Sequence, residues 1–165
     1  MDDENDRRVA REPEVGDLVK ICRSLNENGA RYALIGGFAL IAHGGARTTK
    51  DIDLLVDPSP ENIARTKRAL AVLEDNAAAE LADDDVARYA VCRVADEVIV
   101  DLLARACSVT YEQAQADMEW IELEGVRIPV VSKRTLLATK ETVRPQDAAD
   151  RQLLEWLIHA EEENK

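Results

Sequence analysis

The sequence contains few of the residues that thiol chemistry, metal–imidazole sites or base stacking require. Its three cysteines, Cys22, Cys92 and Cys107, are an odd number without Cys-x-x-Cys spacing, which argues against a disulfide framework and a zinc site. Two histidines are too few for a histidine-rich metal centre. Six aromatic residues provide little area for stacking nucleic-acid bases. We therefore expect a reduced protein in the cytoplasm.

Positive charge and long apolar runs are also scarce. Lysine and arginine number 21 against 33 acidic residues, so the net charge is −12. This balance argues against a broad nucleic-acid-binding surface, although it leaves room for a small basic pocket. No uncharged apolar run has the length of a membrane span, and residues 1–14 lack the apolar core of a signal peptide. We expect no membrane association.

The sequence has the organisation of a single domain. Hydrophobic residues make up 46% of the chain, enough for a core, and no repeat or Gly/Ser/Pro-rich linker divides it. We predict a flexible arm at residues 1–13, a single domain at 14–160 and a flexible tail at 161–165.

Hydrophobic periodicity and turn signals predict an α+β fold, a mixed sheet flanked by helices with two helices at the C-terminal end. Residues 36–37 are predicted as a turn, and residues 76–87 as a helix followed by a loop. Two hairpins are predicted, one around Ala95-Asp96 and one around Glu124-Gly125. Helices are expected at 14–28, 38–43, 59–74, 132–141 and 145–160, and strands at 31–35, 51–56, 88–94, 97–103, 119–123 and 126–131.

Two acidic sites stand out within these strands. Side chains alternate along a strand, so Asp51 and Asp53 face the same side, opposite an apolar Ile52 face. Paired carboxylates of this kind suit Mg²⁺ together with substrate phosphates. Asp101 lies in the apolar segment 98–103, where a buried carboxylate needs a partner such as a metal ion. The alternatives are a solvated strand face for the pair and a water-facing strand end for Asp101.

Glycine and basic residues supply two further candidate features. Gly36-Gly37 falls between a predicted strand and helix, where backbone N–H groups can approach a phosphate, although a lone glycine pair is most often an ordinary turn. Two segments, 28–50 and 125–140, contain no acidic residue. They could form one electropositive pocket for a polyphosphate, or reflect chance. Their basic residues are Arg31, Arg47, Lys50, Arg127, Lys133, Arg134 and Lys140.

Taken together, the segments 35–44 and 47–54 resemble the nucleotidyltransferase superfamily, which has a polymerase-β-like fold. The shared pattern is a strand, a Gly-Gly or Gly-Ser turn, a helix and an Asp-x-Asp strand, with a third aspartate that would be Asp101 here. The segment 126–132 and the residues that follow it resemble bacterial nucleotidyltransferase-like proteins of the abortive-infection toxin type. Those following residues are Leu136, Leu137, Lys140, Arg144, Asp147 and Asp150.

The resemblance implies Mg²⁺-dependent transfer of a nucleoside monophosphate from an NTP with release of pyrophosphate. Asp51, Asp53 and Asp101 would be the catalytic, metal-binding residues of a two-metal site, with Mn²⁺ as an alternative ion. The phosphates would be bound by Gly36, Gly37, Arg47, Lys50, Lys133 and Lys140. Gly37 replaces the serine that many members use to contact a phosphate.

The same resemblance leaves the acceptor and the partner open. An RNA end, such as that of a tRNA, a protein side chain or a small molecule could receive the nucleotide, and a protein antitoxin could be a partner. Asp147 and Asp150 could support Lys140 and Arg144 or belong to a solvated helix face, which is the favoured interpretation for Asp150. The main alternative function is a catalytically silent module that binds nucleotide or a protein. The remaining alternative is a domain in which these motifs occur by chance.

Overall fold

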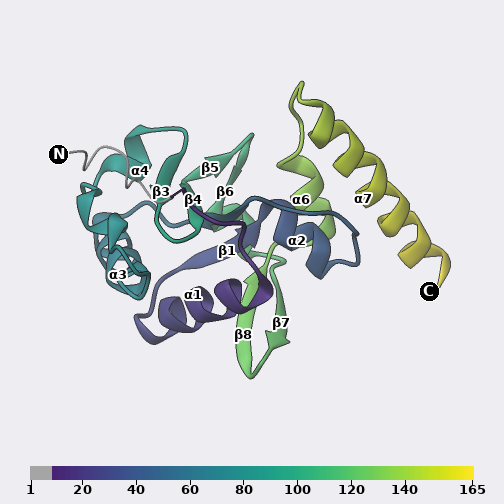
Figure 1. Cartoon of the computed structure of the whole chain (residues 1–165). Helices are drawn as coiled ribbons and strands as arrows, with labels where there is room; N and C mark the ends of the chain where they lie inside the picture. Colours follow the sequence, from purple (N-terminus) through teal and green to yellow (C-terminus); the bar gives the residue numbers. More distant parts are fainter. Residues whose placement is uncertain (1–8) are drawn as a thin grey trace.

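The computed structural model of the chain describes residues 9–165, which form a six-stranded mixed sheet with helices packed against it (Figure 1). The strands are β1 (Tyr32–Ile35), β2 (Asp51–Val56), β3 (Cys92–Ala95), β4 (Ile99–Leu103), β7 (Glu119–Leu123) and β8 (Val126–Val130), in the spatial order β3-β4-β2-β1-β8-β7. Strands β1 and β2 are antiparallel, whereas β2 and β4, and β1 and β8, are parallel. The predicted α+β class is confirmed.

The helices come from both halves of the chain and cover the sheet. They are α1 (Val15–Glu27), α2 (Gly36–Ala42), α3 (Pro60–Leu70), α4 (Asp85–Arg88), α5 (Tyr111–Gln115), α6 (Lys133–Ala138) and α7 (Pro145–Glu163), with a 3₁₀ turn at Ala77–Glu80. Helix α1 packs on α3 and β8, and α2 packs on β1, β2 and α6. Helix α7 lies outside α6 at the edge of the molecule (Figure 1). No helix within residues 9–165 has the length and hydropathy to cross a membrane.

Local signals explain where several elements begin. Ser59 accepts a hydrogen bond from the Asn62 amide and precedes Pro60 at the first position of α3. Ser132 likewise accepts from the Thr135 amide at the start of α6. The buried Asn62 side chain then accepts from the Arg31 amide and donates to the carbonyls of Arg31 and Asp57, which ties α3 to the beginning of β1 and the end of β2.

The differences from the predicted elements are local. Gly36 and Gly37 are the first residues of α2 and not a turn before it. Helix α3 ends at Leu70 instead of residue 74, and α7 continues to Glu163, so residues 161–163 of the predicted tail are helical. Between 104 and 118 no element was predicted, yet two short strands, β5 (Arg105–Ala106) and β6 (Val109–Thr110), precede α5.

Described residues of the predicted arm and of the predicted tail contact the domain. The predicted arm lies outside the described residues at positions 1–8, but Arg11 donates from its backbone amide to the Glu97 carbonyl and from its guanidinium to both oxygens of Asp17. At the other end, Glu161 and Glu162 pair with Lys133 and Arg134 of α6. These ion pairs join the last turns of α7 to the first turn of α6.

Candidate active site

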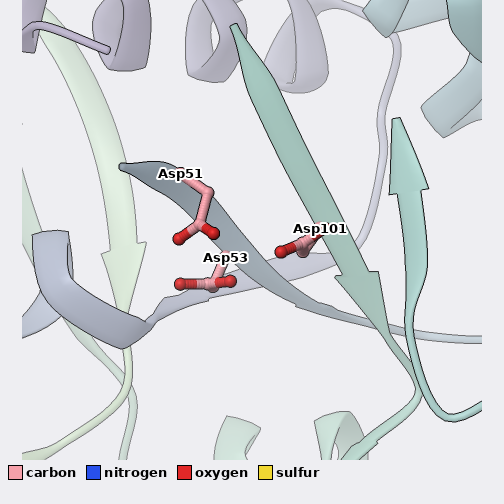
Figure 2. Close-up of side chains that lie close together, drawn as sticks. All are labelled: Asp51, Asp53 and Asp101. Carbon is pink, nitrogen blue, oxygen red and sulfur yellow. The ribbon is translucent and has the colours of Figure 1, made fainter. Parts of the chain in front are cut away.

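Three carboxylates meet on two neighbouring strands. Strands β2 and β4 are parallel and pair Asp53 with Asp101, so these side chains are neighbours on one face of the sheet. Asp51 lies two residues before Asp53 and faces the same way. Each of the three residues offers a carboxylate oxygen that lies within 4.8 Å of the other two. Figure 2 shows the three carboxylates directed toward one another, two from β2 and one from β4.

Burial and mutual repulsion make the cluster resist full ionisation. Asp101 is 4% exposed, and Asp51 and Asp53 are partly buried. Burial, together with the neighbouring charges of Asp51 and Asp101, raises the pKa of Asp53 to about 7 against the opposing charge of Lys140. Burial and the Asp101 charge also raise the pKa of Asp51. Three carboxylates held this closely need positive charge to be ionised together.

Glycine at position 36 is required by the position of Asp53. Strand pairing sets Ile35 opposite Asp53, so the chain that enters α2 passes directly over this carboxylate. A Cβ atom at Gly36 would lie 2.1 Å from Asp53 Oδ2, and its φ of +71° is a conformation that favours glycine. At Gly37 a Cβ atom would lie 2.7 Å from Thr49 Cβ. The glycine pair therefore brings backbone against the carboxylate cluster.

Basic side chains line the same cavity as the carboxylates and are held by two buried aspartates. Lys140 Nζ is 3.0 Å from Asp150 and 3.8 Å from Asp147, and Arg47 Nη1 is 2.6 Å from the same Asp150 oxygen that faces Lys140. Arg144 Nε donates to Asp147 over 2.8 Å. Burial acts to raise the pKa of Asp147, but hydrogen bonds from Thr142 and Arg144 hold it below its usual value.

This arrangement corrects the interpretation of Asp150 as part of a solvated face. The side chains of Asp147 and Asp150 are each only 3% exposed, and both contact Lys140. A buried carboxylate is stable only when it is paired, so these two aspartates and their cations form one network between α6, α7 and the Arg47 loop. The network holds Lys140 and Arg47 at the wall of the active-site cavity.

One cavity of about 490 Å³ collects most of the predicted site residues. Lys50 is exposed and does not line it. Lys133 does not line it either, because it faces the end of α7 and pairs with Glu161 over 3.0 Å. The two basic segments therefore contribute Arg47 and Lys140 to the cavity and direct Lys133 elsewhere. The predicted residues brought together are Gly36, Gly37, Arg47, Asp51, Asp53, Asp101 and Lys140.

A larger cavity, of about 740 Å³, lies where β2 ends and β1 begins. It is lined by Arg31, Asp57 and Tyr111 among others, and it contains none of the three clustered aspartates. Size alone does not identify a catalytic site, whereas a convergent set of carboxylates and cations does. The smaller cavity is therefore the candidate active site.

Sequence analysis missed Arg93, which lies at the mouth of this cavity. Its Nε donates to Asp101 Oδ1 and its Nη2 to Asp101 Oδ2, each over 3.0 Å, and Nη2 also reaches Asp51 Oδ2 at 3.3 Å. Asp101 raises the pKa of Arg93 through these bonds, so the guanidinium remains charged. The signal that would have found Arg93 is the pairing of β3 with β4, which sets it opposite Asp101.

The carboxylate set fits a divalent cation with a preference for oxygen ligands. Asp51, Asp53 and Asp101 provide hard anionic ligands on one side of an open cavity, which leaves the other side for water or phosphate oxygens. Their mutual repulsion is the feature that a bound cation would relieve. The glycine backbone and the Lys140–Arg47 wall complete a site suited to a metal-bound polyphosphate.

Similarity to known proteins is found among solved structures and family models. No curated protein sequence matches the chain. Among solved structures, it is similar to a Thermotoga maritima protein provisionally assigned as a nucleotidyltransferase, with 15% identity and a TM-score of 0.55 over 88% of this chain and 92% of that chain. At this identity the similarity shows the fold alone. A family model, the nucleotidyl transferase AbiEii toxin of type IV toxin–antitoxin systems, matches residues 19–152, which include the whole aspartate cluster and both buried aspartates of α7. The chain therefore belongs to the AbiEii family of nucleotidyltransferase toxins.

Proposed function

We propose that this nucleotidyltransferase transfers a nucleoside monophosphate from an NTP to a hydroxyl acceptor, with Mg²⁺ held by Asp51, Asp53 and Asp101. The observation that carries the proposal is the convergence of three carboxylates within 4.8 Å, in a cavity that Lys140 and Arg47 also line. Negative ligands for a cation and positive ligands for a phosphate therefore line one cavity. That is the charge arrangement that phosphoryl transfer requires.

The bond changes balance in a single displacement. The acceptor oxygen bonds to the α-phosphorus of the NTP while the bond from that phosphorus to the oxygen bridging the β-phosphate breaks, and pyrophosphate leaves. The proton of the acceptor hydroxyl passes to Asp101 or to water beside it. Divalent cations bound by the three aspartates would supply charge neutralisation on the attacking and leaving oxygens.

The chain's own residues have distinct parts in this proposal. Asp51 and Asp53 would hold a cation that neutralises charge on the triphosphate, and the Gly36–Gly37 backbone would let the phosphates lie close to it without a side chain in the way. Lys140 and Arg47, oriented by Asp150, neutralise the charge that develops on pyrophosphate. Mn²⁺ provides the same oxygen-preferring coordination and is expected to substitute for Mg²⁺.

The charge of the protein surface says more about the acceptor than the cavity does. A net charge of −12 disfavours a large RNA footprint. The acceptor pools to be assayed are an RNA end, such as that of tRNA, a protein side chain and a small-molecule hydroxyl. We further propose that the protein acts as a toxin countered by a protein antitoxin. The family to which it belongs supports this role, and expression without the antitoxin should arrest growth only when Asp53 is intact.

The test is transfer of label from α-³²P-NTPs in the presence of Mg²⁺. Wild type should label at least one acceptor pool and release pyrophosphate, and Asp53→Asn should do neither. Glu122→Gln is the matched control, because it removes one carboxylate from an exposed position on β7 and should retain activity. Labelling that persists in Asp53→Asn, or that is unaffected by EDTA, would contradict the proposal.

A further inference from the structure

Arg93 places a positive charge on the same carboxylates that form the proposed metal site. It lies on β3, and the antiparallel pairing of β3 with β4 sets it directly opposite Asp101. Its two donor atoms contact the two oxygens of Asp101 over 3.0 Å each, and one of them also approaches Asp51 at 3.3 Å. A planar guanidinium and a carboxylate in this two-bond arrangement form one of the stronger side-chain ion pairs.

The pair uses the atoms that a divalent cation needs. Both oxygens of Asp101 accept from Arg93, and the Asp51 oxygen that Arg93 approaches belongs to the aspartate cluster. A cation that binds between Asp51 and Asp101 must share these oxygens with the guanidinium at close range or displace it. Repulsion between a divalent cation and the guanidinium favours displacement.

The two partners differ in their freedom to move. The Asp101 side chain is 6% exposed and fixed within β4, whereas the Arg93 side chain is 56% exposed. Within residues 9–165, Arg93 has no side-chain hydrogen bond or ion pair except those to Asp101 and Asp51. Arg93 can therefore turn outward with its own charge in water, whereas the buried Asp101 stays in place and then needs a cation as its new partner.

We propose that Arg93 competes with the divalent cation for Asp101 and Asp51, so that the metal alone binds weakly and binds fully only together with a triphosphate. This rests on the proposed function of the aspartate cluster as a metal site. A triphosphate contributes oxygen ligands to the cation and anionic oxygens that can accept the released guanidinium. Arg93 also holds both Asp101 oxygens, so its release frees the carboxylate that, itself or through water beside it, would take the acceptor proton.

The experiment measures Mn²⁺ affinity by the loss of the free-ion EPR signal, with and without a non-hydrolysable NTP analogue. The variant is Arg93→Met, which keeps an unbranched, flexible side chain but removes the charge. The control is Arg88→Met on α4, whose side chain contacts Asp84 and Tyr89 and none of the three aspartates. With Mn²⁺ alone, Arg93→Met should bind roughly tenfold more tightly than wild type, and Arg88→Met should match wild type.

Mn²⁺ affinities measured with and without the analogue distinguish direct competition by Arg93 from the long-range electrostatic effect of removing its charge. It should strengthen Mn²⁺ binding to wild type by a larger factor than to Arg93→Met. Equal or weaker Mn²⁺ binding by Arg93→Met would overturn the inference, since Arg93 would then support Asp101 without competing for it. If neither protein binds Mn²⁺ even with the analogue, the proposed metal site itself fails.

A conservative variant covers the case in which Arg93→Met does not fold. Arg93→Lys keeps the charge but cannot make the two-bond contact with Asp101. Without the analogue, Arg93→Lys should bind Mn²⁺ more tightly than wild type but less tightly than a site with no competing charge at position 93. An affinity equal to or below that of wild type would contradict the inference.

Discussion

Replacement of Asp53 by asparagine should stabilise the metal-free protein at alkaline pH while it abolishes transfer. The pKa of Asp53 is about 7 in the folded protein, against an ordinary value of 3.8. Between these values the folded state binds more protons than the unfolded state, so the free energy of unfolding falls as pH rises through this window. Asparagine cannot ionise, and the variant therefore escapes this loss.

The size of the effect follows from the two pKa values. At about 1.4 kcal/mol per pKa unit, their separation sets a ceiling of about 4 kcal/mol above pH 7. Most of the change in the free energy of unfolding between pH 5 and pH 8.5 takes place within this window. Water at the open side of the cavity weakens the repulsion between the carboxylates, which makes the effect smaller than the ceiling. We expect the advantage of Asp53→Asn to grow by about 1–2 kcal/mol from pH 5 to pH 8.5.

Urea denaturation in EDTA at the two pH values measures this difference directly. Glu122→Gln, which removes an exposed carboxylate, should show the same pH dependence as wild type. An Asp53→Asn advantage that is equal at pH 5 and pH 8.5, or that shrinks at pH 8.5, would refute the electrostatic account of the cluster. Such an outcome would mean that burial and the neighbouring carboxylates do not hold the pKa of Asp53 above its usual value.

Three further predictions follow from the same contacts. Gly36→Ala should lower the free energy of unfolding by at least about 1–2 kcal/mol and abolish transfer, because the added Cβ would collide with Asp53 and the residue has a φ of +71°. Gly16→Ala, which has open space around it, should change neither the stability nor the activity, and urea denaturation compares the stability of the two variants. Lys140→Met should cost about 3 kcal/mol by leaving the buried Asp150 short of a partner, and an unfolding curve equal to that of wild type would contradict the network. Mg²⁺ should raise the melting temperature of wild type more at pH 8 than at pH 6, because Mg²⁺ binds ionised carboxylates. It should have little effect on the melting temperature of Asp53→Asn, and calorimetry at both pH values measures these shifts.

Much of the site could be predicted because its signals are local. Strand 51–56 has the bounds predicted from its alternation, and the Asp-x-Asp spacing alone sets both carboxylates on one face. Asp101 could be recognised because a lone carboxylate in an apolar strand needs a partner. The caps at Ser59 and Ser132 fixed two helix starts by the same kind of local chemistry.

What was missed depends on pairing between distant segments. A two-residue turn at Ala95-Asp96 would set Arg93 opposite Val98 and on the other face of the strand, whereas the observed partner is Asp101. The loop is longer because the Asp96 carboxylate accepts backbone amides from Asp75, Ala77 and Glu97. No periodicity reveals contacts of this kind.

For the aspartates on α7, the sequence left open whether they support Lys140 and Arg144 or face water, and the structure shows the first. A pattern of charged residues along a helix is typical of a solvated face, and Asp150 fits that pattern. Only the packing of α7 on α6 places it against Lys140 and Arg47. The missed segment at 104–118 contains one local signal, the Thr110–Gln113 capping box that begins α5.

The central claim is that Asp51, Asp53 and Asp101 together bind the divalent cation that receives the triphosphate. The most direct test is a crystal structure of the protein with Mn²⁺ and a non-hydrolysable NTP analogue, with the ion located by anomalous scattering. The account predicts Mn²⁺ coordinated by oxygens of the three aspartates and of the phosphates, with Lys140 and Arg47 on the phosphate side. Mn²⁺ and analogue bound elsewhere, such as in the larger cavity beside Tyr111, with the three aspartates bare of metal, would contradict it.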